Sequence, residues 1–266
     1  MACIRGSQIA NHKWVLSVAL FLPLTVGDLA PTGTLRATFI GNNPVQGRVD
    51  AGSGAVTGPC PDLVREFGRR SGVPVSVTPL GDANAVIDSV TSGKADIGCL
   101  AIEAARAKQV DFSDPYLVSG SAYAVRADAP IKTSADVDRA GVTVGAVTSQ
   151  SQGVWVRENL KAARLHMLPV VPPNAEIASL ISGRTIDAFA ANRTRMEELA
   201  AAFPAIRVLS DDFMVVGQAF AVPRGNRARL AEVNRLVAEA RASGVVKASI
   251  DRANIPGTAV APAPTR

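Results

Sequence analysis

Residues 95–116 read ADIGCLAIEAARAKQVDFSDPY, and this stretch decides how the rest of the chain is interpreted. Its first part, Asp96 to Ile102, is a short apolar run typical of a buried strand. Arg106 follows, and the turn-rich FSDPY closes the segment at Tyr116. One interpretation is a surface helix that runs into a loop. The other is an anion-binding helix start that faces a cleft, because a guanidinium matches a carboxylate and a helix start adds free N–H groups.

Strand and helix patterns alternate on both sides of this stretch. Before it, the patterns predict strands at 34–40 and 73–79 and helices at 62–72 and 83–92. After it, they predict strands at 121–125, 141–146, 166–171 and 186–191 and helices at 134–138, 154–163, 174–182 and 226–243. The repeated order predicts an α/β protein with two similar lobes, each a mostly parallel sheet flanked by helices.

The chain is expected to cross twice between these lobes. It leaves the first lobe near Ser121 and returns near Val216, and two crossing strands make a hinge. We therefore assign residues 34–121 and 216–255 to lobe 1 and residues 122–215 to lobe 2.

The two ends of the chain differ from the lobes. A basic start precedes the uncharged run WVLSVALFLPLTV from Trp14 to Val26, which is shorter than the ~20 apolar residues of a membrane span. Residues 1–27 are interpreted as a secretory signal peptide cut near Gly27, with a single-span anchor as the alternative. The Pro- and Ala-rich residues 256–266 are expected to be a disordered tail.

Composition argues against several classes of function. The net charge of +5 is spread along the chain, without the basic stripe and aromatics of a nucleic-acid surface. The only histidines, His12 and His166, cannot build a His triad or a His-rich metal site, and no phosphate loop is present, so we expect no metal or cofactor. Cys3 belongs to the signal peptide. Cys60 and Cys99 either pair in an oxidising compartment or remain small buried hydrophobes.

ADIGCLAIEAARAKQVDFSDPY resembles the signature of the family 3 extracellular solute-binding proteins, the polar amino-acid receptors of bacterial ABC importers. The shared features are the strand, the helix start, the Arg and FS-x-PY. Weaker similarity covers roughly residues 34–250, including GPCPDL at 58–63 and GRTIDA at 183–188. The resemblance implies a two-lobed periplasmic-binding-protein fold of type II. It also implies a monomeric periplasmic receptor that delivers a small carboxylate-bearing solute to permease and ATPase subunits.

The same resemblance assigns binding residues. It implies that Arg106 pairs with the α-carboxylate of the ligand and that Gly98, Cys99 and Ala101 line the wall of lobe 1. The wall of lobe 2 is assigned to Thr148 and Ser149, whose amides precede a helix. A plain helix cap is the alternative for these two residues.

Other positions depart from the family pattern. Ala101 and Glu103 stand where Thr is common, and Asn192 stands where an Asp usually pairs with the ligand's α-ammonium. An Asn accepts a hydrogen bond without supplying a charge, so ammonium recognition is expected to be weakened or moved. Glu103 is a candidate for the missing charge, and its alternative role is to stabilise a helix start. Asn43 and Asp82 stand near the places where aromatic side chains often sandwich the ligand.

Two further functions stay open at this point. An enzyme on the same scaffold, similar to cyclohexadienyl dehydratase, would use Glu103 as acid or base beside Arg106. The sequence places no second acid or base for it. A periplasmic sensor subunit is the third hypothesis, although no signalling domain follows in the sequence.

Overall fold

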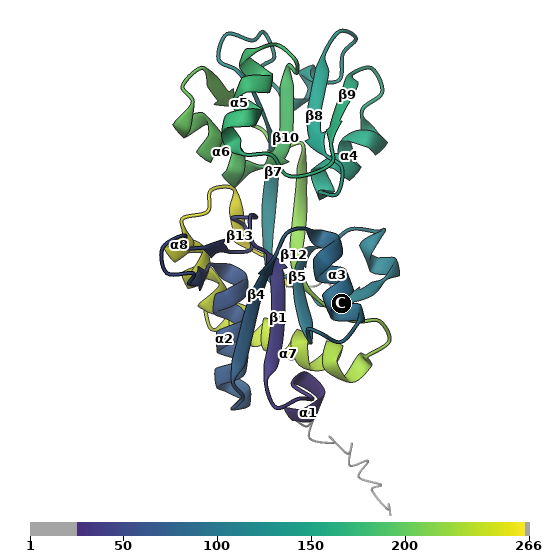
Figure 1. Ribbon diagram of the computed structural model, residues 1–266, viewed down its shortest axis with the longest axis vertical. Helices are drawn as coiled ribbons and strands as arrows, with labels where there is room; N and C mark the ends of the chain where they lie inside the picture. Colours follow the sequence, from purple (N-terminus) through teal and green to yellow (C-terminus); the bar gives the residue numbers. More distant parts are fainter. Residues whose placement is uncertain (1–25, 264–266) are drawn as a thin grey trace, which may run out of the picture.

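The structure, a computed structural model, describes residues 26–263. The predicted signal peptide of residues 1–27 therefore lies outside the described residues, except for its last two. Figure 1 shows two lobes stacked along the long axis and joined by two long strands. No helix among the described residues has the length and apolar character needed to cross a membrane.

Lobe 1 is built on a parallel sheet in the order β4-β1-β5. Its strands are β1 (Leu35–Ile40), β4 (Val75–Leu80) and β5 (Ile97–Ala101). Its helices are α1 (Val26–Leu29), α2 (Pro59–Ser71), α3 (Ala83–Thr91), α7 (Arg227–Ala242) and α8 (Val245–Ala253). Apolar residues repeat at helical spacing along α2, where Leu63, Val64 and Phe67 are fully buried against the sheet.

Lobe 2 repeats this plan with the parallel order β10-β8-β9. Its strands are β8 (Thr143–Val147), β9 (Arg164–Leu168) and β10 (Ala188–Asn192), with β11 (Ile206–Val208) paired to β7. Its helices are the 3₁₀ turn η2 (Ser134–Asp136), α4 (Ser151–Asn159), α5 (Asn174–Ser182) and α6 (Arg193–Ala202).

Two long antiparallel strands form the hinge, β7 (Leu117–Arg126) and β12 (Met214–Pro223). Leu117–Ser121 pairs with Met214–Gln218, so the two strands are partners where they pass between the lobes. Beyond that ladder β7 pairs with β10, and β12 pairs with β5. The predicted fold class, with two lobes and two crossings, is confirmed. The lobe limits 34–121, 216–255 and 122–215 remain our interpretation, and the β7–β12 ladder supports them.

Several elements of the structure were not predicted. They are the hairpin β2 (Arg48–Val49) and β3 (Val56–Thr57), β6 (Val110–Phe112), β13 (Thr258–Val260), α1, α6, α8 and β11. Most are short, and their hydrophobic patterns are correspondingly weak. The helix start expected at Arg106 is the 3₁₀ turn η1 (Arg106–Lys108).

The C-terminal tail differs from the sequence-based prediction. Residues 258–260 were expected to be disordered, but β13 pairs antiparallel with β7 from Leu117 to Ser119. Upstream of it, the Pro256 carbonyl accepts a 2.9 Å hydrogen bond from the Thr194 hydroxyl of lobe 2. The physical reason is that this part of β7 would otherwise expose unpaired backbone groups, and β13 satisfies them.

Ending the chain after Gly257 is expected to lower stability by about 1–2 kcal/mol, because it removes the β13 ladder and the burial of Val260 and Ala261. For a protein of this size the midpoint of thermal unfolding should fall by about 2–6 °C. A chain that ends after Ala263 keeps β13 and is the control. Equal midpoints for the two chains would contradict a structural role for β13.

Cys60 and Cys99 form a disulfide, which settles the alternative left open by the sequence. Their Cα atoms are 6.2 Å apart, and 39 positions separate them in the chain. Both side chains are fully buried, so the bond ties the start of α2 to strand β5 inside the core of lobe 1.

Candidate ligand-binding cleft

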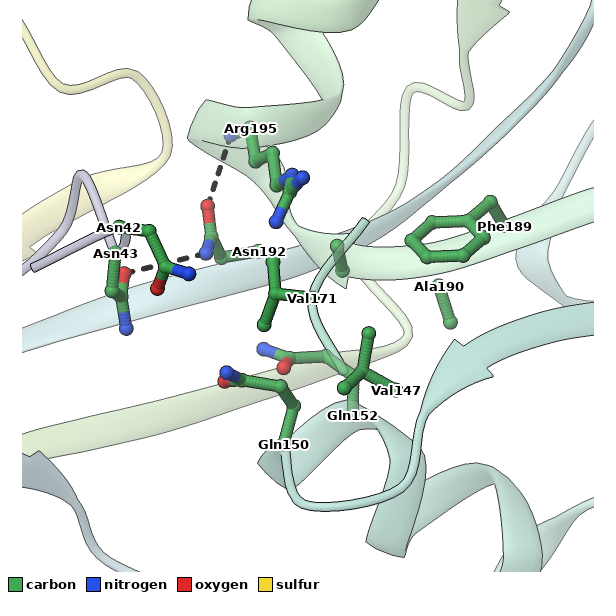
Figure 2. A pocket seen from close by; sticks show the side chains of 11 residues that line it. Asn42, Asn43, Val147, Gln150, Gln152, Val171, Phe189, Ala190, Asn192 and Arg195 are labelled. Carbon is green, nitrogen blue, oxygen red and sulfur yellow. Dashed lines mark hydrogen bonds between the residues drawn. The ribbon is translucent and has the colours of Figure 1, made fainter. Parts of the chain in front are cut away.

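A cavity of about 20 Å³, partly open to solvent, lies between the lobes. In this conformation it has room for about one water molecule. Lobe 1 contributes the loop after β1, and lobe 2 contributes the rest. The lining residues are Asn42, Asn43, Val147, Gln150, Gln152, Val171, Phe189, Ala190, Ala191, Asn192 and Arg195. Figure 2 shows their side chains around this space.

A buried glutamine fixes the lobe 1 loop that reaches the cavity. The Gln46 side chain accepts a 2.9 Å hydrogen bond from the backbone N–H of Ile40, at the end of β1. Its amide group donates to the Gln218 side chain of hinge strand β12 at 3.3 Å. Gln46 is 0% exposed, so the loop that carries Asn42 and Asn43 is anchored to both β1 and the hinge.

Asn192, a predicted site residue, lines the cavity at the end of β10. Its Oδ1 accepts a 2.9 Å hydrogen bond from the backbone N–H of Arg195, which makes Asn192 the N-cap of α6. Since a backbone N–H can only donate, this bond orients the amide and leaves its NH₂ group as the free end. That group lies 3.5 Å from Oδ1 of Asn43 in lobe 1. Asn192 therefore faces the cleft with hydrogen-bond donors.

Arg106 lies at the interface of the lobes and is only 5% exposed. Its Nη1 donates to the Ala101 carbonyl at 3.1 Å, and its Nη2 donates to the Ser149 carbonyl of lobe 2 at 2.9 Å. The Glu103 carboxylate is 3.7 Å from Nε. Burial lowers the pKa of Arg106, and the Glu103 charge raises it. Arg106 is thus a buried cation that bridges the lobes and contacts mainly neutral acceptors.

The surroundings of Arg106 correct one prediction. The expected helix start is η1, a 3₁₀ turn of three residues. Such a short turn offers neither the row of free amides nor the dipole of an α-helix. Any anion near Arg106 would therefore be held by the guanidinium and by groups from lobe 2.

Gly98 and Cys99 do not lie on the cleft wall to which the resemblance assigned them. Side chains alternate across β5, so Gly98 faces Val86 and Val90 of α3, and Cys99 faces the core on the other side in its disulfide. Ala101 ends the strand and meets Arg106 through its carbonyl. Of these three residues, only Ala101 touches the inter-lobe region.

The β8–α4 turn approaches the cavity with residues just after the predicted pair. Thr148 is exposed, and Ser149 contributes its carbonyl to Arg106, but the cavity is lined by Gln150 and Gln152. Helix α4 starts at Ser151 instead of the predicted 154, and its start carries no side-chain cap. The Ser151 hydroxyl is buried there without a partner. This helix start supplies the free backbone N–H groups that the sequence analysis attributed to Thr148 and Ser149.

Glu103 acts on its own turn in the structure. Its Oε1 accepts a 2.7 Å hydrogen bond from the Ala105 backbone N–H, and it is not among the residues that line the cavity. Glu103→Gln keeps an oxygen for that bond, so we expect ligand affinity to stay within about 3-fold of wild type. Calorimetric titration measures this. A loss above 10-fold that is confined to ligands with an ammonium group would instead show that Glu103 replaces the missing Asp.

Sequence reasoning missed Arg195, Gln150, Gln152 and Asn42 as cavity residues. A signal for Arg195 was present, because Asn192 is a good N-cap and the following RTRMEELAAA is rich in strong helix formers. That pattern predicts α6 and puts Arg195 in its first turn. Asn42, Gln150 and Gln152 lie in loops or at a helix start, and no periodic pattern marks them.

A two-lobed α/β protein with strand hinges and a polar cavity between its lobes has the architecture of a solute-binding protein. The sequence comparison specifies the family. Residues 37–253 match the model of the bacterial extracellular solute-binding proteins, family 3, so the chain belongs to this family.

Individual relatives agree with this assignment. The chain is 28% identical over 254 residues to the L-cystine-binding protein TcyJ of Escherichia coli strain K12, covering 88% of this chain and 91% of the relative. A putative binding component of an ABC transporter from Wolinella succinogenes, complexed with lysine, has a TM-score of 0.72 at 21% identity, covering 83% and 95% of the two chains. The ancestral amino acid-binding protein AncCDT-1, a precursor of cyclohexadienyl dehydratase, has a TM-score of 0.70 at 24% identity, covering 85% and 97%.

Proposed function

We propose that the protein is the periplasmic receptor of an ABC importer and that its lobes close on a small carboxylate-bearing solute held by Arg106. The observation that carries the proposal is the buried guanidinium of Arg106 at the lobe interface. Its two short hydrogen bonds go to neutral carbonyls, and its nearest carboxylate is 3.7 Å away. A buried cation is strongly stabilised by an anion that bonds to it bidentately.

Lobe 2 supplies complementary donors for the same anion. The Ser149 carbonyl that Arg106 contacts lies two residues before Ser151, the first residue of α4. The uncapped N–H groups at that helix start and the Ser151 hydroxyl add donors. A carboxylate in the cleft would bond to Arg106 from lobe 1 and to the α4 start from lobe 2. Such bridging favours the closed form to the extent that the ligand binds the closed form more tightly than the open form.

The relatives support the transport role. TcyJ is a cystine-binding protein, and the Wolinella succinogenes protein is a putative component of an ABC transporter. Permease and ATPase subunits are the corresponding partners of this chain, and export to the periplasm accords with the extracellular family.

The composition of the cavity supports a receptor over a dehydratase. Its lining residues include five primary amides and one arginine, but no Asp, Glu, His, Lys, Cys or Tyr that could transfer a proton. Glu103, the acid or base of the enzyme hypothesis, is bonded to its own turn.

Ligand-induced thermal stabilisation tests the proposal. A ligand that binds only the folded state adds about 2.7 kcal/mol of stability at 100 times its Kd. We expect at least one small carboxylate to raise the unfolding temperature without being consumed, as checked by mass spectrometry of the supernatant. If no carboxylate shifts the transition, or if the compound is converted to product, the receptor proposal is wrong.

A further inference from the structure

Arg195 is the one charged side chain among the residues that line the cavity. It lies in the first turn of α6, and Figure 2 shows its guanidinium extending from the helix toward the space beside Val171 and Gln152. The side chain is held in place at its far end. Nε donates to Oδ1 of Asn174 at 3.2 Å, and Nη2 donates to the Pro172 carbonyl. The end of the β9–α5 connection and the first residue of α5 thus fix the direction of the guanidinium.

Arg195 has no carboxylate partner among residues 26–263. The nearest acid on its own helix, Glu198, forms an ion pair with Arg48 of lobe 1. Burial lowers the pKa of Arg195 and the Glu198 charge raises it, but an arginine stays protonated in either case. Nη1 makes no hydrogen bond in the described part of the chain. A cation that is partly removed from water and lacks a counter-ion is an unfavourable arrangement that a bound anion relieves.

The rest of the cavity offers nothing to balance an ammonium group. Asn192, at the position of the expected Asp, uses its Oδ1 to cap α6 and turns its NH₂ group toward Asn43. The lining contains no acidic residue. Glu103, outside the lining, is occupied by its own turn. The cavity lining therefore carries one guanidinium group, that of Arg195, among neutral amides. Arg106 lies outside the lining and bonds to the Ser149 carbonyl, next to the lining residue Gln150.

We infer that the ligand is a small organic dianion, with one carboxylate on Arg106 and its second acidic group on Arg195, and that no ammonium group is required. This inference rests on the proposed function, since it takes Arg106 as the first anchor. Arg195 becomes the residue that determines specificity: it favours a second negative charge. Val147, Val171 and Phe189 contact the carbon chain between the two charges.

The test is calorimetric titration of the whole protein with five-carbon probes that differ in charge. Glutarate and 2-oxoglutarate carry two carboxylates, and pentanoate carries one. L-glutamate adds an ammonium group to two carboxylates, and L-glutamine adds an ammonium group to a single carboxylate. We expect wild type to bind glutarate or 2-oxoglutarate at least 10-fold more tightly than pentanoate. We also expect L-glutamate to gain nothing over glutarate from its ammonium.

The variants separate Arg195 from general charge effects. Arg195→Gln should weaken dicarboxylate binding by about 10- to 100-fold and leave pentanoate binding within about 3-fold, because one charge-assisted contact is lost. Arg195→Lys keeps the charge without the planar fork, so its dicarboxylate affinity should lie between those of wild type and Arg195→Gln. Arg227→Gln removes an exposed charge at the start of α7 and is the control, with no expected change. Thermal unfolding of each variant confirms that it is folded.

The outcomes distinguish a failure of the dianion inference from a failure of the proposed function. If wild type binds pentanoate or L-glutamine as tightly as the dicarboxylates, or if Arg195→Gln weakens all probes equally, the dianion inference is overturned and the carboxylate receptor stands. If wild type binds no carboxylate at all, the proposed function fails and the inference fails with it.

Discussion

Arg106→Ala is expected to weaken carboxylate binding by about 100- to 1000-fold. The guanidinium is 5% exposed and bridges β5 of lobe 1 to Ser149 of lobe 2. Truncating one member of a buried, hydrogen-bonded charge pair costs about 3–4 kcal/mol, since the partner charge is left in the cleft without its counter-ion. Titration calorimetry with the best carboxylate from the thermal screen measures the loss.

Arg106→Lys is the matched variant, because it keeps the charge and removes the bidentate geometry. We expect it to retain part of the affinity, at roughly 10-fold below wild type. Both variants also lose the bridge to Ser149, so their folding must be checked by circular dichroism. An Arg106→Ala protein that is folded and binds the ligand like wild type would show that the carboxylate is anchored elsewhere.

Cys60→Ala/Cys99→Ala is expected to destabilise the protein by about 4 kcal/mol. The disulfide closes a loop across 39 positions, and the loss of conformational entropy in the unfolded chain grows with the logarithm of loop length. Equilibrium unfolding in guanidinium chloride measures the effect as a lower midpoint. Ligand affinity should change little, because both sulfur atoms lie in the core of lobe 1 and not in the cavity lining.

Two observations would contradict this role for the disulfide. One is a count of two free thiols on the unfolded, unreduced mature protein, since Cys60 and Cys99 are the only cysteines outside the predicted signal peptide. The other is a double variant whose stability falls by less than about 1 kcal/mol. Wild type unfolded in the presence of a reductant should match the double variant.

The architecture followed from sequence where the hydrophobic pattern was strong. Apolar runs such as Ile97–Ala101 and Thr143–Val147 are buried strands, and the helices between them have one buried face. The hinge was only half predicted. Residues 117–120 read LVSG, and the buried Ser119 and Gln218 pack where the strands cross between the lobes. Such a polar stretch of strand lacks the apolar signal on which prediction relies.

Helix α6 shows why the cavity was predicted less well than the fold. Only Thr194, Met196 and Leu199 are buried on it, so its apolar face is narrow and its pattern is weak. Because helix α6 was not predicted, Asn192 could be interpreted as a ligand-binding residue but not as an N-cap. The position of Arg195 relative to the cavity could not be predicted either. The capping hydrogen bond from the Arg195 N–H to Oδ1 of Asn192 depends on the positions of both residues at the start of α6. It determines which end of the Asn192 amide faces the cleft.

The family resemblance assigned Arg106 to the binding site, and the structure places it buried between the lobes, outside the cavity lining. The predicted wall residues Gly98 and Cys99 were assigned by their position next to the motif, whereas alternation along β5 directs them into the core. Gln150 and Gln152 replace Thr148 and Ser149 at the cavity because α4 begins at Ser151. A shift of a few residues at a helix start is enough to exchange the side chains that reach a ligand.

A titration in which only the ligand's charge at Arg106 is changed tests carboxylate recognition most directly. Wild-type protein is titrated with its best carboxylate ligand and then with the primary amide of the same compound. We predict 1:1 binding of the carboxylate and a loss of about 100-fold or more for the amide, because a neutral group cannot pair with the buried guanidinium. Equal affinities for the acid and the amide would contradict the claim that this cleft recognises a carboxylate.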